Sequence, residues 1–206
     1  SSAEDLRAIR KIMEESTKFL SLSGLSGVFL GLLAIAGAVI AWLFILDKGS
    51  IGYEEYLNAI SAERAAAIRW HMTILAVAVL ILSVTTALFF SFRNAKRTGK
   101  GFLTPASRRL LINLLIPLTA GGIFALTLAI QSHIQLIIPV FLIFYGLALI
   151  NAGKFTFSEV FYLGISEIII GLLSAIFPDQ GLLFWILGFG ILHIVYGIMM
   201  YRKYQV

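Results

Sequence analysis

Six long apolar runs decide what this chain can fold into. Crossing ~30 Å of hydrocarbon takes about 20 helical residues, and runs of roughly that length cover residues 22–46, 68–92, 110–130, 134–150, 158–177 and 182–201. A helix is favoured in a bilayer because it satisfies its backbone hydrogen bonds within one segment. The sequence therefore predicts an all-α, polytopic membrane protein: six transmembrane helices arranged as three helical hairpins, in one domain over residues 1–206.

Composition supports the lipid bilayer as the solvent of this chain. Hydrophobic residues make up 59% and charged residues 13%, whereas a soluble domain is near half apolar and a quarter charged. The net charge of +5 does not indicate a nucleic-acid partner, because membrane proteins gather basic residues at the cytoplasmic ends of their spans. The chain has no cysteine, which excludes disulfides and thiol chemistry.

The distribution of Lys and Arg predicts the orientation. Six spans put both termini on one side of the membrane, and that side carries thirteen Lys and Arg against three on the other. The positive-inside rule then places both the N- and the C-terminus in the cytoplasm. We expect a multi-pass protein of the cell (inner) membrane.

Residues 3–20 predict an amphipathic helix on the cytoplasmic surface. Their apolar side chains recur at helical spacings between charged ones: Leu6, Ile9, Ile12, Met13, Phe19 and Leu20. Most stripes of this kind bury themselves against their own protein. The alternative use is a docking face for a soluble cytoplasmic partner.

Small residues mark where the helices should touch. Lipid tails are as apolar as leucine, so helices in membranes associate through close packing and polar contacts. Span one carries Gly24, Gly27 and Gly31 at offsets of three and four, which share one helix face. Spans five and six each carry two glycines seven residues apart, also on one face: Gly164 and Gly171; Gly190 and Gly197.

One ionisable residue interrupts each of the last two glycine stripes. Glu167 lies nine residues after Ser158, and His193 lies nine residues before Arg202. At 1.5 Å per residue, both side chains are ~13 Å from the cytoplasmic boundary. We expect the two stripes to face each other, and Glu167 and His193 to meet directly or through a water.

Such a pair has two interpretations. A lone charge in the membrane interior costs several kcal/mol and is usually paired or neutralised, so Glu167 and His193 are expected to share a proton and titrate as a unit. Histidine ordinarily titrates near neutral pH. The pair is either polar glue between helices, worth ~1 kcal/mol, or a functional proton or ligand site, the default hypothesis for an intramembrane acid.

Enzyme signatures are absent from the sequence. It shows no Ser–His–Asp order, HExxH motif, phosphate loop or nucleotide fingerprint, so we do not expect an enzyme. His71 and His133 fall near the outer surface without metal-ligand spacing, and only His193 is deep enough to face a haem. We therefore expect neither a metal nor a cofactor.

The last four spans contain a repeat. "FYGLALINAG" (144–153) aligns with "GFGILHIVYG" (188–197), so that Gly146 matches Gly190 and Leu149 stands in the place of His193. Both copies run in the same direction, which makes the repeat parallel rather than inverted.

The last hairpin, residues 164–198, also resembles the short repeat of HdeD-like bacterial membrane proteins. The matching positions are Gly164, Gly171, Pro178, Gly188, Gly190 and Gly197. This resemblance implies a small six-span inner-membrane protein of a kind linked to acid resistance.

Two functional hypotheses follow. The first is a proton-sensitive bacterial-type membrane protein, such as a transporter, channel or acid-stress factor, that works through Glu167 and His193. The second is a non-catalytic accessory or structural protein that docks a soluble partner through its cytoplasmic face. Homo-oligomerisation, the substrate and the identity of any partner stay open.

Overall fold

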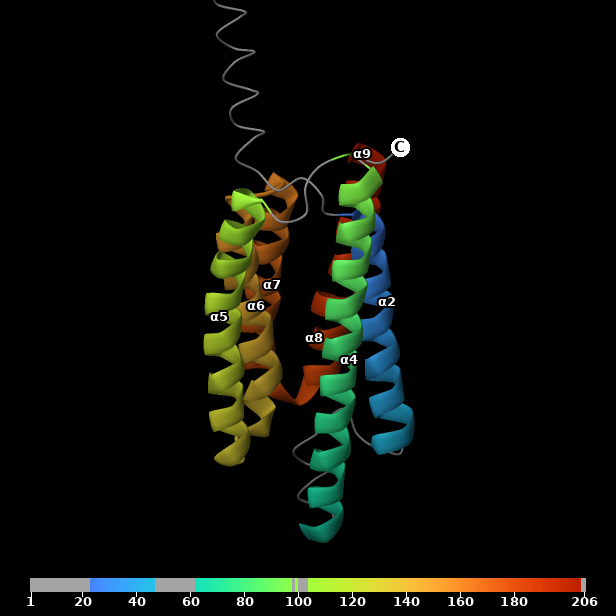
Figure 1. Ribbon diagram of the computed structural model, residues 1–206. Helices are drawn as coiled ribbons and strands as arrows, with labels where there is room; N and C mark the ends of the chain where they lie inside the picture. Colours follow the sequence, from blue (N-terminus) through green and yellow to red (C-terminus); the bar gives the residue numbers. More distant parts are fainter. Residues whose placement is uncertain (1–22, 47–61, 98, 100–103, 205–206) are drawn as a thin grey trace, which may run out of the picture.

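The chain is helical throughout the part that the structure describes. The computed structural model describes residues 23–46, 62–97, 99 and 104–204, which contain no strand. Within those ranges, six helices are long and apolar enough to cross a membrane (Figure 1). The predicted all-α class and number of spans are confirmed, whereas the predicted helix over 3–20 lies outside the described residues.

Several spans are composites of different helix types. The elements in chain order are α2 (Gly24–Ile40), π-helix η1 (Ala41–Ile45), α4 (Ala62–Arg97), α5 (Pro105–Ile130), 3₁₀ turn η2 (Ile134–Leu136), α6 (Ile137–Gly153), α7 (Ser158–Ile176), 3₁₀ turn η3 (Pro178–Gln180), α8 (Gly181–Trp185), π-helix η4 (Ile186–Leu192) and α9 (His193–Tyr204). The sequence did not predict either π-helix.

Two of the helices begin ahead of the apolar runs that predicted them. α4 begins at Ala62, ahead of the predicted start near residue 68, and α5 begins at Pro105, ahead of residue 110. At the start of α5 the Thr104 hydroxyl accepts a hydrogen bond from the Ser107 N–H at 3.1 Å, and the Ser107 hydroxyl accepts one from the Thr104 N–H at 2.8 Å. An apolar run shows which part of a helix can lie in hydrocarbon, whereas capping residues determine where the helix begins and ends.

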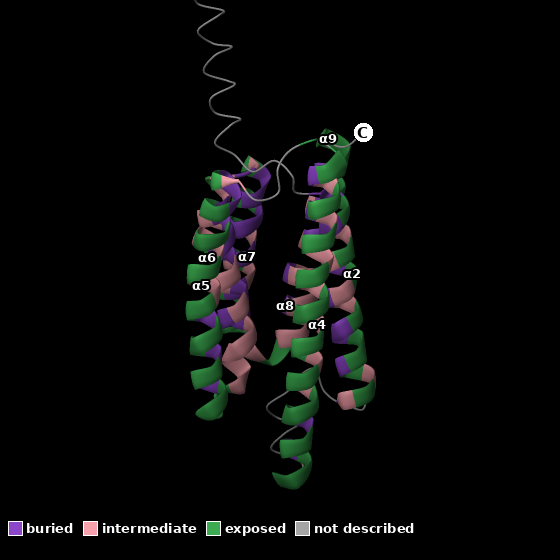
Figure 2. Ribbon diagram, viewed as in Figure 1, coloured by how far each residue is buried: buried purple, intermediate pink, exposed green. Residues whose placement is uncertain are grey.

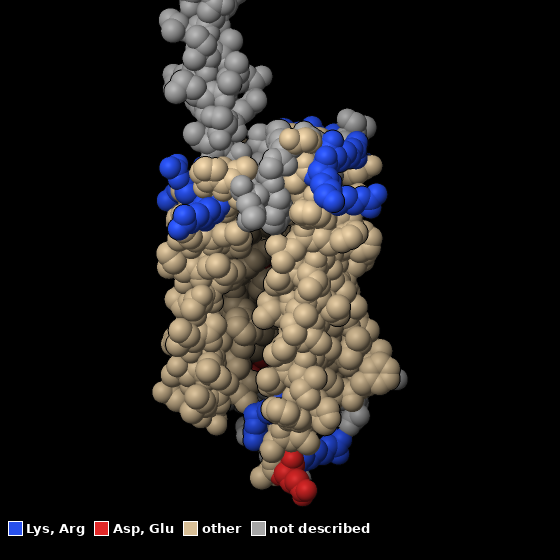
Figure 3. Space-filling view, in the orientation of Figure 1, with Lys and Arg blue, Asp and Glu red and all other residues tan. Residues whose placement is uncertain are grey.

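The six spans form an open arc in the order α4, α2, α9, α7, α6 and α5. One half of the arc contains α2, α4 and the last span, and the other contains α5, α6 and α7 (Figure 1). The halves meet where α7 packs against η4, α8 and α9, and where α6 packs against α8. Figure 3 shows the surface hollowed between the halves, on the side of α4 and α5.

Burial follows the seam between the halves. Figure 2 shows that α4 and α5 are largely exposed, whereas α6 and α7 carry most of the buried residues of their half. The exposed faces are apolar; examples are Leu80 and Phe89 on α4 and Ile116 and Ile123 on α5. Such faces suit a lipid solvent.

Glycines allow two pairs of helices to pack backbone to backbone, and neither pair is the one that the sequence predicted. A Cβ added to Gly146 would lie 2.6 Å from the Gly164 carbonyl oxygen, which shows that α6 and α7 touch backbone to backbone. A Cβ added to Gly27 would lie 2.9 Å from the Gly197 Cα, so α2 and α9 approach equally closely. The prediction that the glycine stripes of the last two spans face each other is therefore wrong.

Helix geometry explains this error. The remaining stripe residues follow the same two contacts: Gly171 faces α6, Gly24 faces α9, and Gly31 meets Gly190. A three-residue offset turns a side chain by about 60° around the helix axis. His193 therefore projects from the flank of a stripe that itself faces α2, and it reaches α7 from there.

Candidate functional site

Glu167 lies at the middle of α7, nine residues from each end of the helix. Its side chain is fully buried, at 0% exposure. The carboxyl lies against Gly188 of η4, where an added Cβ would be 2.7 Å from Oε2 and 2.4 Å from Cδ2 of Leu142. A larger residue at position 188 would require the Glu167 carboxyl or the Leu142 side chain to shift.

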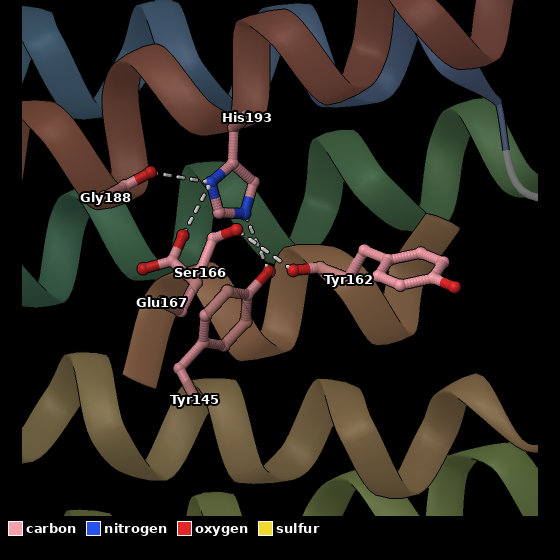
Figure 4. Close-up of polar contacts among 6 residues, drawn as sticks. All are labelled: Tyr145, Tyr162, Ser166, Glu167, Gly188 and His193. Carbon is pink, nitrogen blue, oxygen red and sulfur yellow. Dashed lines mark hydrogen bonds and ion pairs between the residues drawn. The ribbon is translucent and has the colours of Figure 1, made fainter. Parts of the chain in front are cut away.

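His193, the first residue of α9, faces this carboxyl. Its Nδ1 is 3.4 Å from Oε1 of Glu167 and 3.1 Å from the Gly188 carbonyl oxygen (Figure 4). The predicted approach of Glu167 and His193 is confirmed. The π-helix η4 directly precedes His193, and such turns are frequent at functional sites.

Tyr145 of α6 is the third member of the site. Its Oη lies 2.8 Å from Nε2 of His193, and the two rings stack with centroids 5.4 Å apart. Three helices thus converge on one imidazole (Figure 4).

The geometry restricts where protons lie on His193. A carbonyl oxygen only accepts hydrogen bonds, so Nδ1 carries the hydrogen that points to Gly188. In the neutral ring, Nε2 then accepts from the Tyr145 hydroxyl. In the imidazolium, Nε2 instead donates to the Tyr145 oxygen.

The carboxyl of Glu167 is poorly satisfied. Among the described residues, neither Oε1 nor Oε2 has a hydrogen-bond partner, and Ser174 Oγ, two turns further along α7, also has none. Buried polar atoms are paired in the great majority of cases, and exceptions occur at redox, catalytic or water-binding positions. Proximity to His193 is therefore the main compensation for burying this acid.

Aromatic side chains enclose the histidine on the side of the last span. Phe189 lies 5.3 Å from the Tyr145 ring and 4.6 Å from the Trp185 ring, measured between centroids. The Trp185 indole N–H donates to the Ala34 carbonyl oxygen of α2 at 3.1 Å. This hydrogen bond links the aromatic residues around the imidazole to α2, a helix that supplies no polar side chain to the site.

A second polar cluster joins the halves at the basic end of the bundle. Glu159, at the start of α7, accepts hydrogen bonds from Lys203 Nζ at 2.5 Å and Tyr204 Oη at 3.0 Å. As the acid in the first turn of α7, Glu159 stabilises the N-terminus of that helix. The contacts with α9 show that it also links α7 to the last span.

The structure repeats one packing unit. Gly146 of α6 meets the Gly164 carbonyl and Ile168, four residues later; Gly190 meets the Gly31 carbonyl and Ile35 in the same way. These contacts support the predicted match of Gly146 with Gly190. By this equivalence Leu149 takes the place of His193, and Ala34 takes the place of Glu167.

Comparison with known proteins adds no relative. No family model matches the chain, and no curated protein or solved structure matches it either. The resemblance of residues 164–198 to HdeD-like proteins stays a prediction.

Sequence reasoning missed Tyr145 and the role of Gly188. Tyr145 lies 48 residues from His193, and in isolation it is an ordinary aromatic residue of a span. The repeat held a usable signal, because it aligns Tyr145 with Phe189 and so shows one extra hydroxyl at matched positions.

The other histidines lie apart from this site. The His71 ring is hydrogen-bonded to the Ala67 carbonyl of its own helix at 2.7 Å, and His133 lies in the turn between α5 and η2. Within the residues that the structure describes, no three His, Asp or Glu side chains group as metal ligands.

Proposed function

We propose that this chain is a small, proton-responsive membrane protein whose Glu167–His193 pair takes up and releases one proton inside the bilayer. The supporting observation is the ionisable pair itself: a fully buried acid 3.4 Å from an imidazole nitrogen. Such a group can serve a proton-linked transporter, a proton channel or an acid-stress protein.

Ionisability favours this role over simple packing. Glue between helices can be made with Ser or Asn, whereas an acid in a span is costly unless it is paired. Carboxylate with neutral imidazole carries one negative charge, and adding a proton makes the pair neutral overall. Proton binding therefore changes the electrostatic free energy of the seam, which a serine or asparagine contact does not do.

The pair also lies where a change in its protonation can act on the contact between the two halves. Glu167 belongs to one half of the arc and His193 to the other, and Tyr145 contributes from α6. A change of charge at this point acts on the contact between two three-helix groups. Packed interfaces respond to such changes by moving between discrete arrangements.

We further propose a cell-membrane location with the basic end in the cytoplasm. Figure 3 shows Lys and Arg at both ends of the bundle, with more of them at the end that carries the α9 C-terminus. The positive-inside rule assigns such an end to the cytoplasm.

Proton flux in liposomes tests the proposal. The purified protein is reconstituted with an entrapped pH indicator, a pH step is applied, and the internal pH is followed for wild type, Glu167→Gln and His193→Gln. We expect flux above that of protein-free liposomes in wild type, and its loss in both variants. Ser166→Ala is the matched control, since the Ser166 hydroxyl bonds the Tyr162 carbonyl of its own helix.

Two results would count against this role. Equal flux in wild type, Glu167→Gln and His193→Gln would show that the pair is packing glue. Wild-type liposomes no more permeable than protein-free ones would contradict a transporter or channel.

A further inference from the structure

Two tyrosines extend the site toward the basic end of the bundle. Tyr145 is bonded to His193 Nε2 at 2.8 Å. Tyr196 lies three residues after His193, on the same face of α9 and nearer the helix end. Both rings pack against one cluster, formed by Leu149, Val160 and Leu163.

Glu159 continues this line to the surface. Tyr196 lies between His193 and Lys203 along α9, three residues after the first and seven residues before the second, and offsets of three and seven keep side chains on one face of a helix. Glu159 is itself 7% exposed, and it bonds Lys203, whose side chain is 58% exposed. Polar groups therefore occur at successive depths from solvent to the imidazole.

Fewer polar groups lie on the other side of the Glu167–His193 pair, away from the basic end. Beyond Glu167 the next buried polar group on the same face of α7 is Ser174, seven residues or ~10 Å away. Its hydroxyl has no hydrogen-bond partner within the described residues. Among titratable side chains of the neighbouring elements, Tyr145 of α6 contacts the pair. Glu159 of α7 and Tyr196 of α9 lie nearer the basic end, and α2, α8 and η4 contain no titratable side chain.

We propose that Glu159, Tyr196 and Tyr145 form the route by which protons enter and leave the Glu167–His193 pair, from the basic end only. Tyr145 passes its hydroxyl proton to Nε2 of His193 and receives one from Tyr196. Tyr196 is resupplied from solvent at Glu159. Each tyrosine ends neutral, and the charge of the pair changes from −1 to 0.

The repeat supports a specific use of these hydroxyls. Tyr145 is equivalent to Phe189, and Tyr196 is equivalent to Ala152, by the alignment of 144–153 with 188–197. Each hydroxyl is therefore present in only one copy of the repeat. Packing alone does not call for that difference.

The inference rests on the proposed function, and a pH-jump experiment tests the proton route separately from that function. The protein is placed in lipid nanodiscs, protons are released by a light flash, and protonation of the pair is followed by time-resolved infrared spectroscopy. The variants are Tyr145→Phe and Tyr196→Phe. Controls are Tyr162→Phe, an exposed tyrosine of α7, and Ser174→Ala on the opposite side of Glu167.

We expect Tyr145→Phe and Tyr196→Phe to slow protonation by about a hundredfold or more, the lower end of the range for a positioned proton donor. Both controls should keep the wild-type rate, and Tyr196→Phe should keep the wild-type equilibrium titration. Unchanged rates in both tyrosine variants, or slowing by Ser174→Ala instead, would overturn the route. A wild-type pair that does not titrate at equilibrium would refute the proposed function itself.

Discussion

Gly188 lies directly against the carboxyl of Glu167. The gap is so narrow that a Cβ at position 188 would stand 2.7 Å from Oε2. Because the Gly188 carbonyl also accepts the Nδ1 hydrogen of His193, this one residue makes room for the acid and orients the imidazole.

Gly188→Ala should therefore disturb the pair. The new methyl group meets Glu167 and Leu142, so the acid must move away from His193. We expect a loss of roughly 1–3 kcal/mol in the free energy of unfolding, the usual range for overpacking, measured by denaturation in mild detergent. Gly122→Ala is the control, because nothing lies within 4 Å of its new methyl. Equal effects of the two substitutions would mean that the gap at Gly188 is not tight.

Gly197→Ala should loosen the contact between α2 and α9. Its Cβ would lie 2.5 Å from the Val28 nitrogen and 2.6 Å from the Gly24 carbonyl oxygen. Backbone atoms cannot rotate away as side chains do, so the two helices must separate. We expect a lower thermal unfolding midpoint than that of Gly188→Ala, where one obstacle is a flexible carboxyl. A midpoint at or above that of wild type would contradict the close α2–α9 contact.

The stability that the cluster around Glu159 contributes should depend more on Glu159 than on Lys203. Glu159 contacts Lys203, Tyr204 and Ser158, whereas the exposed Lys203 contributes a solvent-screened ion pair. We expect Glu159→Ala to lower the thermal midpoint more than Lys203→Ala does. The loss in Lys203→Ala should shrink as salt is added. The reverse order of the two variants would show that the lysine holds the halves together.

Trp185→Phe should weaken the tie between the last span and α2. Phenylalanine keeps the ring that packs on Phe189 but cannot donate to the Ala34 carbonyl. Since an interhelical hydrogen bond in a membrane is worth ~1 kcal/mol or less, we expect a loss of that size in the free energy of unfolding. Trp42→Phe, on an exposed residue of η1, is the comparison. A larger loss in Trp42→Phe would contradict this account.

The sequence predicted the elements of this fold better than their contacts. The length of the apolar runs is enough to predict six spans. Counting residues from the cytoplasmic boundary is enough to predict that Glu167 and His193 lie at the same depth. Which glycine stripe meets which helix could not be predicted, because small residues permit close approach to any partner. Tyr145 and Gly188 went unrecognised for a related reason: each acts through a neighbour distant in sequence, and neither residue type indicates a site.

The most direct test of the central claim is a pH titration of isotope-labelled protein in lipid bilayers by solid-state NMR. It follows the Glu167 carboxyl carbon and the two His193 ring nitrogens from about pH 2 to about pH 10, a range that covers the ordinary titration of both groups and beyond. We predict that the signals of both residues change together, with one shared midpoint, and that Glu167→Gln shifts the midpoint of His193. Signals that stay constant over the whole range, or a His193 titration unaffected by Glu167→Gln, would contradict the claim that the two side chains bind a proton as a pair.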